Sequence, residues 1–451
     1  MQAQSKQFLK LIPSSDFYLW DVKRYYNLTK LNFENVVRLR EVLSLYKRPV
    51  SKEEMIQNHW QIIAKINFGG ELFLRDFEEI NTYKGSLNLV PDNAIIYSKI
   101  NVRQGCTYYH EKNKIPFGVS SEYPTYKFDE NKISGKFLQK ILRSDAFKKL
   151  LNTKTTGISK ARVKQNEFLE IEIPLPSLIE QEKIIDTHNN EIAKAALLQQ
   201  QAIKLGEDIE KYLFEELGIK ISKYKKQAGY ISEISFQAIE RWSVEFIKHS
   251  LNSSFISNSK YAPVKLKEII EGYQYGLSVK ALKENVGIPM LRMNNINNSD
   301  LIIDNLKFIP KTDEIGNFIL NKGDLLFNRT NSKELVGKTA VFELDDEFTF
   351  ASYLIRVVIN PKLADCHYIN FLFNSPILQF QKDLISRQIT GQANINAQEM
   401  KEFLFPLPSL DKQKEIANTI KAIRDKIADY KSKAKQIIKK AEHEFENQIF
   451  S

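Results

Sequence analysis

The segment 328–338, NRTNSKELVGK, gathers side chains suited to binding a nucleic acid, directly after the strand-like run GDLLF. Reading base edges requires directed donors and acceptors, whereas binding phosphates requires cations and hydroxyls. Arg329 can pair with guanine, and Asn328 or Asn331 with adenine. The candidate contacts of this segment are Asn328, Arg329, Thr330, Asn331, Ser332, Lys333 and Lys338. The alternative is an ordinary solvated turn.

Three further segments of the same half of the chain carry similar side chains. They are LRMNNINNSD from position 291, the stretch around Gly276, and TGQANIN from position 390. Gln392 and Asn394 in the last of these could equally cap the helix expected to follow. The candidates in the three segments are Arg292, Asn294 and Asn295; Tyr273, Gln274, Tyr275, Ser278 and Lys280; and Gln392 and Asn394.

These residues belong to one copy of an internal repeat. The segment 173–185 reads IPLPSLIEQEKII, and 405–417 reads FPLPSLDKQKEIA. Upstream matches follow in the same order, and the spacing between the copies drifts only from about 222 to 234 residues. The matched pairs are LWDVKRYY and RWSVEFIK (from 19 and 241), VRLREVL and VKLKEII (37 and 264), NAIIYSK and GDLLFNR (93 and 323), SSEYPTYKF and ASYLIRVVI (120 and 351), and TGISK and TGQAN (156 and 390). The order of these matches predicts a duplicated architecture.

The repeat transfers the candidate residues to the first half of the chain. The equivalents of the polar segments there are Lys99, Asn101, Arg103 and Gln104; Lys160 and Arg162; and Lys47, Arg48 and Ser51. The first copy reads IIYSKINVRQG and lacks the Asn-Arg-Thr run of the second.

Each copy consists of a globular part with short β-type runs and a long helix that begins after the Pro-x-Pro. Proline cannot continue a preceding element, so PLP predicts an extended hinge. Ser177 and Ser409 stand where an N-cap hydroxyl is needed, and Glu180 lies at the capping-box offset. Asp411 can favour the second helix start through the helix dipole instead.

Apolar residues on both helices follow a heptad spacing. The seam of the second helix is Ile416, Ile420, Ile423, Ile427, Tyr430, Ala434, Ile437 and Ala441; that of the first is Ile185, Ile192, Ala195, Ala202, Ile209 and Leu213. Positions 180–217 carry nine acidic and four basic residues and 411–447 carry seven acidic and ten basic, so the net charges favour pairing of the helices. The alternative is that each helix packs only on its own globular part. At 1.5 Å per residue each helix is about 57 Å long, which suits a spacer.

The sequence therefore predicts an α+β (mixed α/β) protein with two tandem globular domains. Two long antiparallel helices forming a coiled coil separate them, and the copies are related by a pseudo-two-fold repeat. The expected boundaries are 1–173 for the first domain, 174–220 for its hinge and helix, 221–405 for the second domain, and 406–451 for its hinge and helix.

No catalytic motif is complete. VGKTAV at 336–341 resembles a phosphate-binding loop, but Ser332 occupies the position of the required glycine. Tyr97 stands where a nuclease motif beginning at Asp92 needs an acid, and Asn67-Phe68-Gly69-Gly70 is too short for a methyl-donor loop. The six histidines never meet at metal-ligand spacing, and Cys106 and Cys366 stand far apart. We expect a non-catalytic chain without metal or cofactor.

Composition narrows the class of protein further. Among 451 residues, 43% are hydrophobic, so disorder is excluded as a description of the whole chain. The net charge of +10 is compatible with a polyanionic partner or simply with a lysine-rich surface. The start lacks the layout of a secretion signal, and no apolar run approaches the length of a membrane span. A cytoplasmic location without membrane attachment is expected.

The repeated PLPSL-x-x-Q-x-x-I segments, the two globular parts and the two long helices resemble the specificity subunit of type I restriction-modification enzymes. LLFNRTNSKELVGKTAVF, ASYLIRVVI and ITGQANINAQEMKEFLFPLPSL resemble that family's target-recognition domain. The resemblance covers essentially the whole chain.

The resemblance implies a DNA-binding subunit of a restriction system without catalytic activity of its own. Each target-recognition domain would read one half of a split, asymmetric site in double-stranded DNA, and the helices would set the gap. They would also dock two DNA methyltransferase (modification) subunits, which would carry the methyl donor, and a motor-nuclease (restriction) subunit would join. The alternatives are a coiled-coil scaffold between proteins and, less favoured, a self-contained DNA-modifying enzyme.

Overall fold

The computed structural model describes residues 35–153, 163–219, 259–284, 287–385, 387–389 and 392–450. The chain forms two compact units, the first from residues 1–199 with 432–451 and the second from residues 200–431. Both units are rich in short strands, and the two long helices contribute to both. The predicted mixed α+β class with two β-rich domains and two packed long helices is therefore confirmed.

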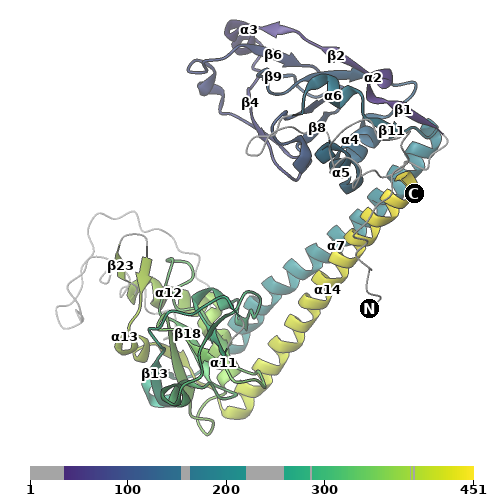
Figure 1. Cartoon of the computed structure of the whole chain (residues 1–451). Coiled ribbons are helices and arrows are strands. Elements are labelled where there is room, and N and C mark those ends of the chain that lie inside the picture. Colours follow the sequence, from purple (N-terminus) through teal and green to yellow (C-terminus); the bar gives the residue numbers. More distant parts are fainter. Residues whose placement is uncertain are drawn as a thin grey trace. The chain divides into compact units, whose positions relative to one another are not determined.

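The first unit is built around the four-stranded sheet β2-β10-β7-β8 and the three-stranded sheet β3-β6-β9 (Figure 1). Its strands are β1 (Val36–Arg38), β2 (Leu43–Tyr46), β3 (Pro49–Val50), β4 (Ile63–Ile66), β5 (Leu72–Leu74), β6 (Leu87–Val90), β7 (Ala94–Tyr97), β8 (Thr107–His110), β9 (Phe117–Val119), β10 (Thr125–Phe128) and β11 (Glu172–Pro174). Its helices are α2 (Leu39–Val42), α3 (Lys52–Gln57), η2 (Phe77–Ile80), η3 (Val102–Gln104), α4 (Gly135–Arg143), α5 (Asp145–Thr153) and α6 (Gln165–Leu169).

The second unit is built around the four-stranded sheet β13-β22-β18-β20, with smaller sheets beside it. Its strands are β12 (Pro263–Lys265), β13 (Ile270–Tyr275), β14 (Ile288–Leu291), β15 (Ile296–Asn297), β16 (Asp300–Leu301), β17 (Lys307–Ile309), β18 (Leu325–Asn328), β19 (Thr330–Asn331), β20 (Thr339–Val341), β21 (Thr349–Phe350), β22 (Leu354–Ile359), β23 (Arg387–Ile389), β24 (Gln392–Asn394) and β25 (Leu404–Pro406). Its helices are α10 (Leu266–Ile269), η5 (Met293–Asn295), η6 (Asp313–Phe318), α11 (Cys366–Asn374), α12 (Pro376–Ile385) and α13 (Ala397–Lys401).

The two units repeat one topology. The sheet order β2-β10-β7-β8 of the first becomes β13-β22-β18-β20 in the second, strand for equivalent strand. The pair β1–β11 likewise corresponds to β12–β25, which joins the start of each domain to the strand before its long helix. The repeats 37/264, 93/323 and 120/351 fall on these equivalent elements. The repeat 19/241 and most of the repeat 156/390 lie outside the described residues.

The long helices are α7 (Leu178–Leu217) and α14 (Leu410–Phe450). The capping box predicted for α7 is present, because Glu180 N–H donates to Ser177 Oγ at 3.4 Å and Ser177 N–H donates to Glu180 Oε2 at 2.9 Å. Ser177 Oγ also donates to Glu180 Oε2 at 2.8 Å, and this bond, followed by the one from Ser177 N–H, lowers the pKa of Glu180. All the predicted seam residues are buried or half-buried, as expected for helices that pack by a heptad stripe.

Both ends of the helix pair show an antiparallel arrangement. In the second unit, Lys412 near the start of α14 forms an ion pair of 2.8 Å with Glu216 near the end of α7. In the first unit, His188 of α7 lies against Phe445 near the end of α14, with ring centroids 5.8 Å apart. The antiparallel pairing predicted from the pseudo-two-fold repeat is thus observed within each unit. Among the described residues, no helix is long and apolar enough to cross a membrane.

The helix ends complete the hydrophobic cores of the units. Phe445, Ile449 and Phe450 of α14 belong to the core of the first unit, together with α4 and α5. Leu213, Phe214 and Leu217 of α7 belong to the core of the second unit. Each domain therefore depends for its core on the end of the long helix that belongs to the other copy of the repeat.

A buried glutamine fixes the start of each long helix to its own domain. Gln181 accepts a hydrogen bond from Ser134 N–H at 2.9 Å, and its amide donates to the carbonyl oxygens of Lys132 and Pro176, both at 2.8 Å. Gln413 repeats these contacts in the second unit. It accepts from Asp365 N–H at 2.9 Å, and its amide donates to Leu363 O at 3.3 Å and Pro408 O at 2.9 Å. Because Ser134 and Asp365 are N-caps of α4 and α11, each glutamine locks two helix starts together.

Candidate nucleic-acid interface

Arg329 is held in a defined place directly after β18. Its backbone N–H donates to Tyr353 O at 3.0 Å, and its carbonyl oxygen accepts from Ile395 N–H at 2.9 Å. Its guanidinium lies over the ring of Tyr275, 5.0 Å from the centroid, and Nη1 donates to Ser352 O at 3.5 Å. Within the described residues, the buried Nε has no hydrogen-bond partner. The guanidinium is thus oriented by stacking while most of its donors stay available.

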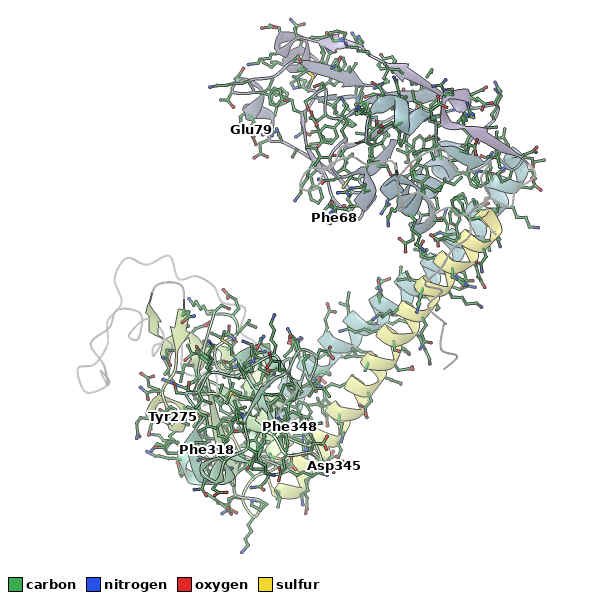
Figure 2. The ribbon with its side chains drawn as sticks, in the orientation of Figure 1. Phe68, Glu79, Tyr275, Phe318, Asp345 and Phe348 are labelled. Atoms are coloured by element: carbon green, nitrogen blue, oxygen red, sulfur yellow. The ribbon has the colours of Figure 1, made fainter. Side chains whose placement is uncertain are left out.

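Arg329 is one end of a ladder of aromatic and cationic side chains. Tyr273 and Tyr275 stand on the exposed face of the edge strand β13, with their rings perpendicular and 6.4 Å apart; Figure 2 labels Tyr275. Lys401 Nζ lies 5.2 Å from the Tyr273 ring centroid. Tyr275 Oη accepts a hydrogen bond from Ala397 N–H at 2.9 Å, which ties the ladder to the start of α13. We call Tyr273, Tyr275, Arg329 and Lys401 the Tyr–Arg face; its aromatic surfaces and cations suit bases and phosphates.

The first unit presents Lys99 in the way that the second unit presents Arg329. Lys99 N–H donates to Glu122 O at 3.0 Å, and its carbonyl oxygen accepts from Val163 N–H at 3.3 Å. Lys99 Nζ donates to Ser121 O at 2.7 Å. In the repeat Ser121 corresponds to Ser352 and Glu122 to Tyr353, so the same backbone frame displays a lysine in one unit and an arginine in the other.

The other first-unit candidates lie in two places. Asn101, Arg103 and Gln104 belong with Lys99 to the loop 98–106 between β7 and β8, where Gln104 is exposed. Arg48 forms an ion pair of 2.6 Å with Glu54, and Ser51 is the N-cap of α3, accepting from Glu54 N–H. Lys47 is exposed in the adjacent turn. Lys160 and Arg162 lie outside the described residues.

Asn328 and Asn295, two of the candidates for base contacts, are buried. Asn328 is 1% exposed, and its amide donates to Met293 O at 3.0 Å. Asn295 is 3% exposed; it accepts from Arg292 N–H and donates to Ile302 O. Both side chains donate to backbone carbonyls within the protein, which weighs against base contacts, and their assignment stays a prediction.

Two cationic candidates are also engaged with the protein. Arg292 donates from Nη2 to Asn305 O at 3.0 Å. Burial lowers the pKa of Lys338, although the charge of Glu210 on α7 acts against this shift. Lys338 is half-buried, which weakens its assignment as a phosphate contact.

The remaining second-unit candidates stay predictions. Thr330 pairs with Asn394 between β19 and β24, and Asn331 Oδ1 accepts from Ser332 N–H at 2.9 Å. Gln274 lies on the face of β13 opposite Tyr273 and Tyr275. The candidates with exposed side chains are Ser278, Lys280, Asn294, Lys333 and Gln392.

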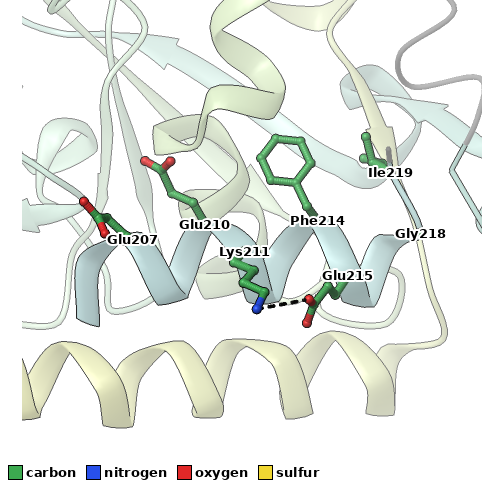
Figure 3. A pocket seen from close by; sticks show the side chains of 7 residues that line it. All are labelled: Glu207, Glu210, Lys211, Phe214, Glu215, Gly218 and Ile219. Atoms are coloured by element: carbon green, nitrogen blue, oxygen red, sulfur yellow. Dashed lines mark ion pairs between the residues drawn. The ribbon is translucent and has the colours of Figure 1, made fainter. Parts of the chain in front are cut away.

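The described part of the chain offers no metal centre, and a pocket beside α7 shares no lining residue with the candidate contacts. The described residues hold no group of three His, Cys, Asp or Glu side chains able to bind a metal ion. A pocket of about 530 Å³ lies along the last turns of α7 and is lined mainly by charged side chains (Figure 3). Lys211 Nζ and Glu215 Oε1 form an ion pair of 3.8 Å in this pocket. Neither Arg329 nor Lys99 contributes to the lining.

Comparison with known proteins identifies the family. The sequence model of the type I restriction modification DNA specificity domain matches residues 258–440. The specificity subunit of the Escherichia coli type I restriction enzyme EcoKI is 24% identical over 298 residues, 65% of this chain and 59% of the relative. The chain matches the specificity subunits of type I restriction-modification systems. This confirms the resemblance inferred from the repeated motifs.

Other members of the specificity-subunit family agree. The MjaVIII specificity subunit of Methanocaldococcus jannaschii is 25% identical over 312 residues, 67% of this chain and 66% of the relative. A further relative from that archaeon is 28% identical over 190 residues, 42% of this chain and 44% of the relative. The chain thus spans less than two thirds of the length of each of these curated relatives. A chain from a structure on complex assembly of the type I system has a TM-score of 0.57 at 15% identity, covering 92% of this chain and 95% of that one, and supports the fold.

Sequence reasoning missed three parts of this specificity subunit's architecture. Lys401 was hidden in an ordinary helix, and Ser352 contributes only its carbonyl oxygen. The glutamine of PLPSL-x-x-Q was used as a marker of the repeat rather than as a structural residue. Its recurrence at both helix starts was the one signal that could have revealed its role.

Proposed function

We propose that this chain is the non-catalytic DNA-reading subunit of a type I restriction-modification complex. Each unit reads one half of a bipartite target in double-stranded DNA. The observation that carries this proposal is the matched presentation of Lys99 and Arg329, each held by the same three contacts on the same sheet topology. Because a lysine is a point charge and an arginine a planar fork of donors, the two half-sites differ in sequence and the target is asymmetric.

We propose further that α7 and α14 set the gap between the half-sites and dock two methyltransferase subunits. A motor-nuclease subunit joins the same complex, the methyl donor binds to the methyltransferase subunits, and the complex works in the cytoplasm. Exposed apolar side chains on α7 support a docking role, because Ile179 is 80% and Ile203 65% exposed. Single exposed apolar residues are common, but two on a helix with a buried seam offer a partner apolar contact area.

The test is selection of target sequences by the purified full-length chain from a library of random DNA duplexes, in parallel with mapping of methylated sites in cells with and without the chain. We expect two short conserved blocks separated by a fixed number of unconserved base pairs, and the same pattern in the methylated sites. A single block or no enriched sequence would contradict the bipartite reader. A steep loss of affinity with salt is expected, since phosphate contacts release counterions.

A further inference from the structure

The hairpin β4–β5 of the first unit carries an exposed phenylalanine at its tip. Phe68 is 62% exposed and Phe73, on the second strand, is 43% exposed. Most of the other described phenylalanines lie within the cores, as expected for so large an apolar side chain. Figure 2 shows Phe68 at the margin of the first unit. The hairpin therefore exposes a large aromatic ring to solvent, where it is available to a ligand.

The tip that carries Phe68 is held rigidly. Asn67 N–H donates to Glu71 O at 3.0 Å, and Gly70 N–H donates to Asn67 O at 2.9 Å. Asn67 also exchanges two side-chain hydrogen bonds with Glu71, of 2.7 and 2.8 Å. Gly70 has φ of +76°, and any Cβ there would meet the guanidinium of Arg143. A preorganised tip loses little conformational entropy when it binds.

The tip adjoins the loop 98–106, which carries the first-unit candidate contacts. A Cβ added to Gly105 of this loop would lie 3.6 Å from the carbonyl oxygen of Phe68 and 3.1 Å from Cε of Lys148. Arg103 and Gln104 directly precede Gly105. Lys65 of β4 lies with Nζ 5.1 Å from the centroid of the Phe73 ring. An exposed ring is thus combined with cations and with a loop suited to base edges; Glu71 and Asp145 are the nearby acids, and Asp145 pairs with Lys148.

We propose that Phe68 is a wedge that inserts between neighbouring base pairs at the edge of the half-site read by the first unit, unstacking that step and bending the DNA. This inference rests on the proposed function. Apolar wedges of this kind open a base step, and the cost of unstacking is offset by the contacts that the bent duplex gains. Stacking of the ring on a base would contribute about a 5- to 150-fold gain in affinity.

The test uses the full-length chain and the duplex selected from the random library, with 2-aminopurine substituted at successive positions of the first half-site. 2-Aminopurine becomes brighter when it is unstacked, so the wild-type chain should raise its fluorescence at one step. Phe68→Ala should abolish this rise and weaken binding by about 5- to 150-fold. Phe68→Trp should retain both properties because it keeps a large aromatic ring.

Ile115→Ala is the matched control. Ile115 is 73% exposed in the same unit and follows β8, whereas the loop 98–106 precedes this strand. Ile115→Ala should therefore leave binding and fluorescence unchanged. The melting temperature of Phe68→Ala should equal that of the wild type because the side chain is exposed. The wedge is refuted if Phe68→Ala keeps full affinity and fluorescence, or if no position brightens with the wild type. A wild-type chain that selects no sequence would instead refute the proposed function.

Discussion

Replacing Arg329 tests whether the Tyr–Arg face reads a base. The guanidinium is stacked 5.0 Å from the Tyr275 centroid, and its hydrogen bond from Nη1 to Ser352 O is long at 3.5 Å. The guanidinium is therefore oriented by the protein, while most of its hydrogen-bond donors stay available. A bidentate arginine–guanine pair is worth about 1–3 kcal/mol of discrimination, which corresponds to roughly 5- to 150-fold in affinity. Arg329→Ala should lose this amount at one base pair of the second half-site and leave the other positions unchanged.

The assay is equilibrium binding of the full-length chain to the selected duplex and to all its single-base-pair variants. Arg329→Lys separates charge from geometry: it should keep most of the general affinity but lose the discrimination at that base pair. Lys99→Ala is the counterpart in the other unit and should affect only the first half-site. If Arg329→Ala weakens binding to every variant equally and reduces the salt dependence, then Arg329 contacts a phosphate and the reasoning fails.

Three predictions concern the framework. Gln413→Ala should destabilise the second unit by about 1–3 kcal/mol in denaturant unfolding, because Asp365 N–H and two carbonyl oxygens lose a buried partner. Lys414→Ala, on the exposed side of the same turn, is the control, and a smaller effect of Gln413→Ala than of this control would contradict the role. Ile449→Ala should destabilise the first unit by about 2–5 kcal/mol although it lies near the chain end, since it is fully buried in that core; calorimetry showing no shift would contradict this. Interaction with His188 and then with Lys140 lowers the pKa of Glu442 to about 2 from 4.5. The Glu442 carboxylate therefore contributes stability above pH 4.5 that is lost as the pH falls toward 2. Glu442→Gln should flatten this part of the pH–stability curve, and an unchanged curve would refute the contribution.

The architecture could be predicted from the sequence because the same motifs occur twice in the same order. The repeated PLPSL segments, the capping pair Ser177 and Glu180, and the heptad seam all report local rules that tertiary packing did not override. The site was harder to predict. Asn295 and Asn331 stand in similar polar stretches of the sequence, yet Asn295 is buried and bonded to backbone groups whereas Asn331 is half-buried in β19 beside Ser332. The spacing of polar residues in the sequence cannot distinguish a side chain that bonds to its own backbone from one that contacts a ligand.

Long-range contacts were beyond the reach of sequence patterns for the same physical reason. Lys401 reaches Tyr273 across 128 residues of chain, and Phe445 completes a core whose other members begin at Leu39. Neither contact has a periodicity or motif of its own. The burial of Gln181 and Gln413 also runs against the usual exposure of glutamine.

The central claim is that two equivalent readers are separated by the paired helices. It is tested most directly by inserting one heptad into each helix at the boundary between the units, after Gln199 of α7 and after Lys431 of α14, and selecting target duplexes again. Seven residues add about 10.5 Å, or up to about three base pairs. The account predicts that both conserved blocks are retained while the gap between them grows. An unchanged gap with both blocks retained would contradict it.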